Sequence, residues 1–309
     1  MAGFTDLPMR LVAYRCGAAY AVGEMLSAKV ELWGTAKSAA RLRFDDGESP
    51  RAVQILAATP EEASRAVRRA KSLGADVVEL NMGCPVRKVM VKGAGAALMR
   101  EPGRAEAILA AMGEAAQESG VTATVKMRLG FDEASLTAPE IAKAAQQAGF
   151  AMVTVHARTA RQAFAGRARH ELLKPVRDAI DIPLAVNGDI TGAETARKAL
   201  ADSGADAVAV GRAALSRPWV FGEIDAALSG KPAPVWTDAD RLAALALHWQ
   251  RHKAFYGIKA HMLFKKRLKL YAQAVPGLAQ ALEGALAASQ EEFEATMRRL
   301  TQAHAGGQA

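Results

Sequence analysis

The sequence is poor in cysteine and has no long apolar run. Its 309 residues include two cysteines, Cys16 and Cys84, which lie far apart in the chain. Two distant cysteines match neither a zinc-ligand spacing nor a disulfide framework, so we expect no metal centre and a reducing, cytoplasmic setting. A stretch of about eighteen apolar residues, the minimum for a membrane-spanning helix, is also missing. These absences argue against a disulfide-stapled secreted domain and predict that no segment crosses a membrane.

Acidic residues are in deficit, above all near the C-terminus. Lys and Arg number 40 against 32 Asp and Glu, which gives a net charge of +8 and a pI near 9.6. Between Arg241 and Leu282 there is no Asp or Glu, but there are eight cations: Arg241, Arg251, Lys253, Lys259, Lys265, Lys266, Arg267 and Lys269. Many basic enzymes bind no nucleic acid, and a charge run is usually a solvated helix face. A run this long without counter-charge nevertheless favours a polyanionic partner.

Short β-branched apolar runs alternate with Ala-rich helical stretches along most of the chain. The expected strands lie in residues 18–25, 51–57, 76–83, 123–130, 151–158, 182–189 and 206–215. One intervening helix is opened by Thr59 as N-cap and Pro60 at its first position. This alternation predicts parallel strands, and continuously apolar strands with helices outside favour a (β/α)₈ barrel over an open sheet. Because these runs make seven strands, we expect the first barrel strand to precede Met1.

The alternation stops after Arg212, and the Pro-rich segment "KPAPVW" follows at residues 231–236. We therefore expect a barrel domain over residues 1–231 and a small all-α domain over residues 232–309. In the second domain Phe264, Leu268 and Tyr271 are spaced as an apolar helix stripe. That spacing predicts that the cations of the same helix point outward.

Polar residues follow the predicted strands, where a barrel of this type builds its active site. The strand ends offer Gln54, Asn81, Cys84, Lys126, Arg128, His156, Arg158, Asn187, Asp189 and Arg212, together with Gly211. Lys126 and Arg128 share one strand face, so an anion is expected beside them. His156 on its own would be explained equally well as a satisfied core histidine.

The last two strands end in glycines, Gly188 and Gly211, with Arg212 next in the chain. Backbone N–H groups at this end of a barrel commonly form a phosphate site. Either glycine alone would be an ordinary turn residue. Together with Arg212, which can neutralise a phosphate, they predict a phosphate cup.

Several motifs together resemble those of the tRNA-dihydrouridine synthases, flavin enzymes that reduce uridines of the tRNA D-loop. The matching segments are "MAGFTDLPMR", "ELNMGCPVRKVMVKGAGAALMR", "VKMRLGFDE", "VTVHARTARQAFAG", "VNGDI" and "AVGRAAL". Among bacterial branches the chain looks most like the B-type subfamily. It departs from the family pattern in two places. Family members usually carry "APMAG" after a complete first strand, whereas this sequence starts at the Met of that motif, Met1; the second departure is in the loop "ARTARQAFAG".

The resemblance implies a role for each candidate residue. Cys84 matches the family's proton donor to uracil C5, since a free thiol is mostly protonated at neutral pH and can release its proton. Proline next to it and a preceding glycine predict an exposed loop; the alternative is a small buried cysteine, the role we expect for Cys16. FMN would be held by Met1, Ala2, Gln54, Lys126, His156, Asn187, Gly188, Asp189, Gly211 and Arg212.

Candidate substrate residues follow from their place at the barrel mouth, beside the Cys84 loop or in the acid-free basic stretch. Asn81 and Arg128 would read the uracil edge, and Arg158, Arg87, Lys88, Lys265, Lys266 and Arg267 would contact tRNA. NADPH is the expected reductant, and it would bind transiently because no GxGxxG motif is present. DNA, a membrane and an obligatory oligomer are not expected. Two rival interpretations are a flavin barrel acting on a free pyrimidine and a tRNA-binding protein that has lost catalysis.

Overall fold

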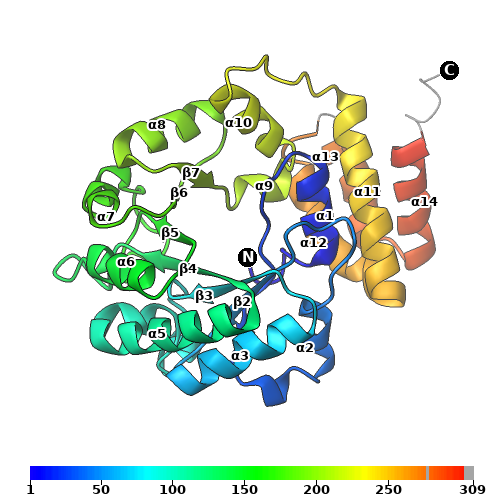
Figure 1. Ribbon diagram of the computed structural model, residues 1–309. Coiled ribbons are helices and arrows are strands. Elements are labelled where there is room, and N and C mark those ends of the chain that lie inside the picture. Colours follow the sequence, from blue (N-terminus) through cyan, green and yellow to red (C-terminus); the bar gives the residue numbers. More distant parts are fainter. Residues whose placement is uncertain (276–277, 303–309) are drawn as a thin grey trace. The chain divides into compact units, whose positions relative to one another are not determined.

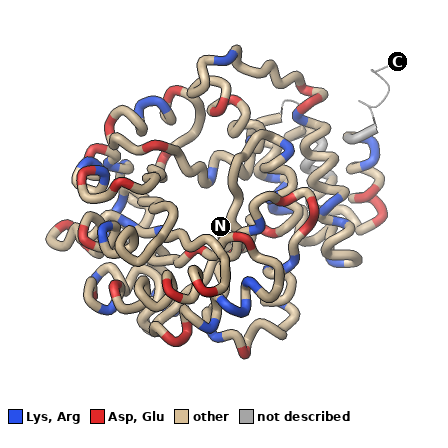
Figure 2. Tube along the Cα trace, viewed as in Figure 1, with Lys and Arg blue, Asp and Glu red and all other residues tan. Residues whose placement is uncertain are grey.

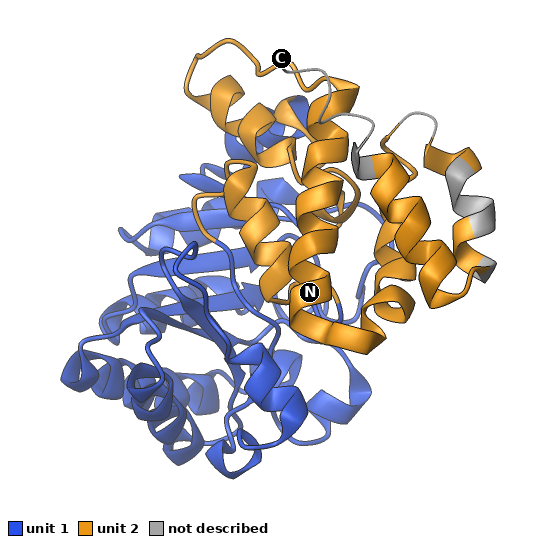
Figure 3. Cartoon of the chain, turned by 90° about the vertical axis from the view of Figure 1, so that its right-hand side faces the viewer, with its two compact units in different colours: residues 1–3, 21–190, 194–211 blue, residues 4–20, 191–193, 212–309 orange. Residues whose placement is uncertain are grey.

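The structure is a computed structural model that describes residues 1–275 and 278–302. It contains two compact units, coloured in Figure 3. Unit 1 comprises residues 1–3, 21–190 and 194–211, and unit 2 comprises residues 4–20, 191–193 and 212–309. The sequence placed one boundary near residue 232 instead. The difference arises because the first helix shares its buried face with the C-terminal helices, as described below.

Unit 1 is built on a parallel sheet of seven strands in chain order (Figure 1). The strands are β1 (Leu26–Ser27), β2 (Ala52–Leu56), β3 (Val77–Asn81), β4 (Thr122–Arg128), β5 (Met152–His156), β6 (Leu184–Asn187) and β7 (Ala207–Ala209). Helices alternate with them on the outside, which makes the unit α/β and TIM-barrel-like, as predicted. The hydrogen-bonded order begins at β1 and ends at β7.

Six of the seven predicted strand regions contain a strand, and the first does not. Residues 18–25 contribute a single bridge, between Val22 and Ala52. The hydrogen-bonded ladder starts at Leu26, one residue after the predicted range ends, where Leu26 pairs with Ile55. Leu26 is fully buried whereas Val22 is half-buried. The segment that buries a large apolar side chain is thus the one that pairs.

The helices between the strands are α2 (Ala36–Arg41), α3 (Pro60–Ser72), α4 (Arg87–Met90), α5 (Pro102–Ser119), α6 (Ala138–Gln147), α7 (Lys174–Ala179) and α8 (Ala193–Ser203). The 3₁₀ turns are η1 (Val30–Leu32), η2 (Gly95–Arg100) and η3 (His170–Leu173). Thr59 caps α3 as predicted, since its hydroxyl accepts from the Glu62 N–H at 3.3 Å. The buried face of α3 carries Ala63, Ala66 and Val67. These small side chains let the helix pack closely, and α3, α5, α6 and α7 are successive neighbours.

The register of the sheet aligns the polar strand ends. Asn81 of β3 lies opposite Lys126 of β4, and Arg128 lies opposite His156 of β5. His156 in turn pairs with Asn187 of β6. Because the strands are parallel, these side chains belong to one edge of the sheet.

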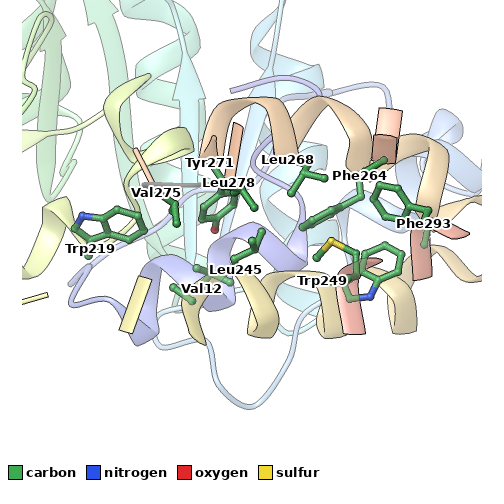
Figure 4. Close-up of a cluster of buried hydrophobic side chains, with 14 of the residues drawn as sticks. Val12, Trp219, Leu245, Trp249, Phe264, Leu268, Tyr271, Val275, Leu278 and Phe293 are labelled. Atoms are coloured by element: carbon green, nitrogen blue, oxygen red, sulfur yellow. The ribbon is translucent and has the colours of Figure 1, made fainter. Parts of the chain in front are cut away.

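Unit 2 consists of α1 (Leu7–Arg15), α9 (Ala213–Ser216), α10 (Val220–Leu228), α11 (Asp238–Tyr256), η4 (Gly257–Lys259), α12 (Ala260–Tyr271), α13 (Leu278–Ala287) and α14 (Gln290–Gln302). Its core is aromatic-rich (Figure 4). The predicted stripe of Phe264, Leu268 and Tyr271 is buried there, which confirms it. Val12 and Cys16 of the α1 region belong to the same core. Cys16 is therefore a packing residue, as predicted, and burial raises the pKa of its thiol to about 12.

A buried ion pair ties the start of α1 to α12. Asp6 caps α1 by accepting from the Met9 N–H at 3.2 Å. Its Oδ2 atom also accepts from the Tyr256 hydroxyl at 2.9 Å and forms an ion pair with Arg267.

Among the described residues, none of the helices combines the length and the apolar composition that a membrane-spanning segment needs.

Candidate active site

Cys84 lies in the turn that follows β3. The side-chain oxygen of Asn81 accepts from the N–H groups of Gly83 and Cys84, both at 3.0 Å. On the other side, the Cys84 carbonyl accepts from the Ala96 N–H at 3.0 Å. Gly95 has φ +61°, and a Cβ there would lie 2.8 Å from the Cys84 carbonyl oxygen, so the backbone can approach this closely only at a glycine.

The expectation of an exposed loop at Cys84 is wrong. The residue is 8% exposed and packs with Val89 and Ala94. The cause is the close approach of the Gly95 segment, which folds over the turn. Cys84 thus lies at the strand-end edge as a buried residue.

Lys126 projects from β4 beside β6. Its Nζ donates to Asn187 Oδ1 at 3.0 Å, and Asn187 Nδ2 donates to the Ala209 carbonyl at 2.6 Å. Burial lowers the pKa of Lys126 to about 8, with the Glu79 carboxylate opposing the shift and Arg128 adding to it. An anion does lie near Lys126: it is Glu79, a residue that the sequence analysis missed.

Glu79 could have been identified from the sequence as a candidate site residue. It lies two residues before Asn81 in a strand whose three remaining residues are apolar, so Glu79 and Asn81 share a face. It is 2% exposed, and burial raises the pKa of its carboxyl. Its Oε1 atom accepts from Gln54 Nε2 at 2.5 Å. A charged residue in a buried strand is rare without a partner, which is the signal.

Arg128 connects the Cys84 turn to the loop after β5. Its Nε donates to the Gly83 carbonyl at 2.7 Å, and its Nη1 donates to the carbonyls of Thr159 and Ala163 at 2.9 and 2.8 Å. Burial lowers its pKa to about 10. These bonds give Arg128 a structural role in two loops, and its contact with uracil stays a prediction.

Arg158 and Asp189 connect the same loop to the end of β6. Arg158 is buried and ion-paired with Asp189 at 2.7 Å, and it also donates to the Ala165 and Gly166 carbonyls. Asp189 accepts in addition from the Ala168 N–H at 2.8 Å. Both residues thus hold the loop, while their predicted contacts with tRNA and FMN stay predictions.

His156 packs against Gly188, which has φ +121°. A Cβ at Gly188 would lie 2.8 Å from the Ala168 Cβ and 3.1 Å from the His156 Cδ2, so this position requires glycine. A Cβ at Gly211 would meet no described atom within 4 Å. Gly211 is thus open on the side where a Cβ would stand, and its contact with a phosphate stays a prediction.

Other predicted cofactor and RNA residues are near the surface. Met1 and Ala2 are exposed at the start of unit 1, and Arg87 and Lys88 are exposed on α4. Arg212 is exposed and is the first residue of the last segment of unit 2, where it precedes α9. None of these positions contradicts its predicted role, and none tests it.

The cations of α12 differ from one another. Arg267 was expected to face outward to RNA, and this is wrong: it is 3% exposed, because the buried Asp6 carboxylate attracts it inward. Lys265 is half-buried and donates to the Leu286 and Ala288 carbonyls at 2.9 and 3.2 Å. Lys266 is exposed, with its Nζ 4.6 Å from the Phe4 ring centroid.

The acid-free stretch obtains counter-charges from outside itself. Arg241 pairs with Asp238 at 3.1 Å, and Lys253 pairs with Glu294 at 2.6 Å. Figure 2 shows the cations and anions of the C-terminal helices. Part of the positive charge of this stretch is therefore neutralised by acidic residues that lie outside it in the sequence.

Asp6, His248 and His252 are buried together, and their potential ligand atoms all lie within 4.8 Å of one another. The spacing resembles a metal site. The guanidinium of Arg267 already binds the carboxylate, however, and supplies the positive charge that a metal ion would bring. A dication next to a buried guanidinium would be repelled, so the cluster does not suit a metal.

Comparisons with known proteins place the chain in a family. It matches the family described as "Dihydrouridine synthase (Dus)" over residues 1–304. It is 38% identical over 279 residues to tRNA-dihydrouridine synthase B of Pseudomonas aeruginosa, covering 90% of this chain and 83% of that protein. The corresponding protein of Xanthomonas axonopodis pv. citri is 37% identical over 306 residues, covering 96% of this chain and 91% of that protein.

Similarity to solved structures is weaker. The old yellow enzyme homologue from Zymomonas mobilis has a TM-score of 0.49 and 14% identity, covering 75% of this chain and 85% of that chain, which supports no conclusion about function. The family is shown by the match over residues 1–304 and by relatives that are 37% and 38% identical over most of both chains. The chain belongs to the dihydrouridine synthase family.

Proposed function

We propose that this protein reduces the C5–C6 double bond of a uridine in the tRNA D-loop, with FMN as cofactor, NADPH as reductant and Cys84 as proton donor. As a member of its family the chain is a flavin-dependent oxidoreductase that acts on uridine in tRNA. The observation that supports the finer statement is the placement of Cys84. Its turn is fixed by Asn81 on one side and Arg128 on the other, at the edge of the sheet that carries Lys126.

The residues present fit a flavin with a phosphate. Gly211 is open on the side where a Cβ would stand, and Gly188 has a positive φ that lets its backbone pass close to His156 and Ala168. Lys126, oriented by Asn187, would offer a cation to the negative charge of the reduced ring. Gln54 would offer its amide to the ring edge. When bound, FMN supplies the hydride that the base takes up.

Cys84 supplies the proton at the other carbon. Loss of that proton leaves a thiolate, and the Arg128 guanidinium interacts favourably with negative charge at Cys84. The thiolate would then recover a proton from solvent before the next turnover. Because Cys84 is buried in this structure, we infer that the target base must leave its stack and enter the site, which is easier in a loop than in a duplex.

The tRNA contacts that we propose come from exposed cations. In unit 1 they are Arg87 and Lys88 on α4, next in the chain to the Cys84 turn. In unit 2 they include Lys266, which is exposed on α12. Phosphate contacts of this kind fix the RNA and carry no base specificity. We also propose a cytoplasmic location and no requirement for an oligomer.

The test is a Cys84→Ala variant, with Cys16→Ala as the control that removes the other thiol. We expect Cys84→Ala to retain flavin and tRNA binding and to lose most turnover, about 10²-fold or more, because general acid catalysis contributes on that order. Dihydrouridine is measured by mass spectrometry of the D-loop after incubation with NADPH and unmodified tRNA. Undiminished dihydrouridine formation by Cys84→Ala would remove the thiol from the mechanism.

The same assay separates the rival functions. Flavin-loaded protein that reduces free uracil and ignores tRNA would indicate a pyrimidine dehydrogenase. Protein that binds tRNA without any flavin absorbance would indicate a binding protein without catalysis.

A further inference from the structure

A line of hydrogen bonds runs from a buried carboxylate to the Cys84 turn. Glu79 Oε1 accepts from Gln54 Nε2 at 2.5 Å, and Gln54 Oε1 accepts from Asn81 Nδ2 at 2.7 Å. Asn81 Oδ1 then accepts from the N–H groups of Gly83 and Cys84 at 3.0 Å each. All of these groups belong to unit 1, on the adjacent strands β2 and β3 and the turn that follows.

The chemistry of the end groups fixes the direction of both amides. A backbone N–H can only donate, so Asn81 must present its oxygen to the turn and its nitrogen to Gln54. Gln54 must therefore present its oxygen to Asn81 and its nitrogen to Glu79. The far end of the line therefore needs a hydrogen-bond acceptor for Gln54 Nε2, and the carboxyl oxygen of Glu79 is that acceptor. Turning either amide over would bring donor against donor or acceptor against acceptor in a buried place, which is costly.

We propose that Glu79 is a positioning residue: by accepting from Gln54 it fixes the orientation of the Gln54 and Asn81 amides and, through Asn81, the backbone of the Cys84 turn. Each amide nitrogen has a second hydrogen. In the orientation set by Glu79, one hydrogen of each amide nitrogen is used within the line, and the second hydrogen of each remains able to donate to another group. As far as catalysis is concerned, this inference rests on the proposed function.

A simpler role for Glu79 is that of counter-ion to Lys126, whose cation it stabilises. The two roles require different properties of residue 79. The counter-ion role needs the negative charge, whereas the positioning role needs an acceptor atom at the place of Oε1. Glu79→Gln keeps an acceptor and removes the charge, and Glu79→Met has similar length and removes both.

A matched control is available on the neighbouring strand. Thr124 is opposite Glu79 in the register, and it is also buried. Its hydroxyl has no hydrogen-bond partner among the described residues. Thr124→Val therefore changes a buried polar group at the same level of the sheet without touching the line of hydrogen bonds.

The first readout is the rate at which iodoacetamide alkylates Cys84 in the flavin-loaded protein, followed by peptide mass spectrometry with the buried Cys16 as internal reference. We expect Glu79→Met to raise this rate about tenfold, because the turn loses its ordered support. Glu79→Gln and Thr124→Val should stay within about threefold of the unmodified protein. This readout does not depend on turnover, so it decides the positioning role even if no dihydrouridine is formed.

The second readout is dihydrouridine formation with kcat and KM for tRNA determined separately. Glu79→Met should lower kcat about tenfold with flavin retained, and Glu79→Gln should preserve most of it. Equal damage in both variants would assign Glu79 to the charge of Lys126 and overturn the proposal, as would an unchanged alkylation rate in Glu79→Met. If Glu79→Met does not fold, Gln54→Met breaks the line one link later, and an unchanged alkylation rate there is equally decisive against it.

Discussion

Acid should destabilise unit 2 through its two buried histidines. His252 is 0% exposed, and its ring centroid lies 4.4 Å from that of Tyr256 and 5.1 Å from that of Phe264. Burial lowers the pKa of His252 to about 3, and the cations of Arg267 and Lys266 add to the effect. The Asp6 carboxylate, 4.0 Å from His252 Nδ1, is already paired with Arg267.

The magnitude follows from proton linkage. An unfolded chain binds a proton at this histidine below pH 6.5, whereas the folded chain does so only near pH 3, so stability is lost as the pH falls through that window. At pH 5 one such histidine costs about 2 kcal/mol relative to pH 8, and about 5 kcal/mol is the limit at lower pH. The pKa of His248 is also lowered, by burial first, so it acts in the same direction.

The assay is urea unfolding followed by tryptophan fluorescence at pH 7.5 and pH 5. Trp219, Trp236 and Trp249 all belong to unit 2 and report on it. His252→Phe keeps an aromatic ring among its neighbours and removes the titrating group. We expect the difference in unfolding free energy between the two pH values to be smaller in His252→Phe by about 2 kcal/mol.

His261→Gln serves as the control, because it changes a histidine of the same unit and leaves the buried pair in place. It should show the same loss of stability in acid as the unmodified protein. An identical pH dependence in His252→Phe and the unmodified protein would refute the assignment of acid sensitivity to this ring.

Three further predictions concern the flavin and RNA residues. Gly188→Ala should cost about 2 kcal/mol or more of stability, whereas Gly211→Ala should cost less than about 0.5 kcal/mol and weaken FMN binding alone, as shown by urea unfolding and flavin titration. FMN affinity should fall as the pH rises through about 8, where Lys126 loses its proton, and Lys126→Met should remove that dependence in the same titration. Lys266→Glu should weaken tRNA binding several-fold in a filter-binding assay without changing the melting temperature, whereas Lys265→Glu should lower the melting temperature too, because Lys265 holds two carbonyls.

The alternation of strands and helices was predictable because burial repeats regularly along the sequence. Each of the six well-placed strands is a largely apolar run, and the polar ends of β3, β4, β5 and β6 are aligned by the register. The short β1 was misplaced, because its pairing depends on the burial of Leu26 and not on the composition of residues 18–25.

Long-range contacts were not predictable in the same way. The partner of Arg267 is Asp6, 261 residues away in the sequence, so a cation in an acid-free stretch gave no sign that it would be buried. The covering of Cys84 depends on the backbone path of Gly95, which a motif does not reveal. Glu79, in contrast, could have been found from its charge within a buried strand.

The position of Asp6 also bears on how the chain is made. During synthesis Asp6 and α1 emerge well before Arg267, which follows Asp6 by 261 residues. Until α11 and α12 are complete, α1 has neither the partner of its N-cap carboxylate nor the core that buries Val12 and Cys16. Unit 2 therefore cannot finish folding until α12 has been synthesised, even though α1 emerges much earlier.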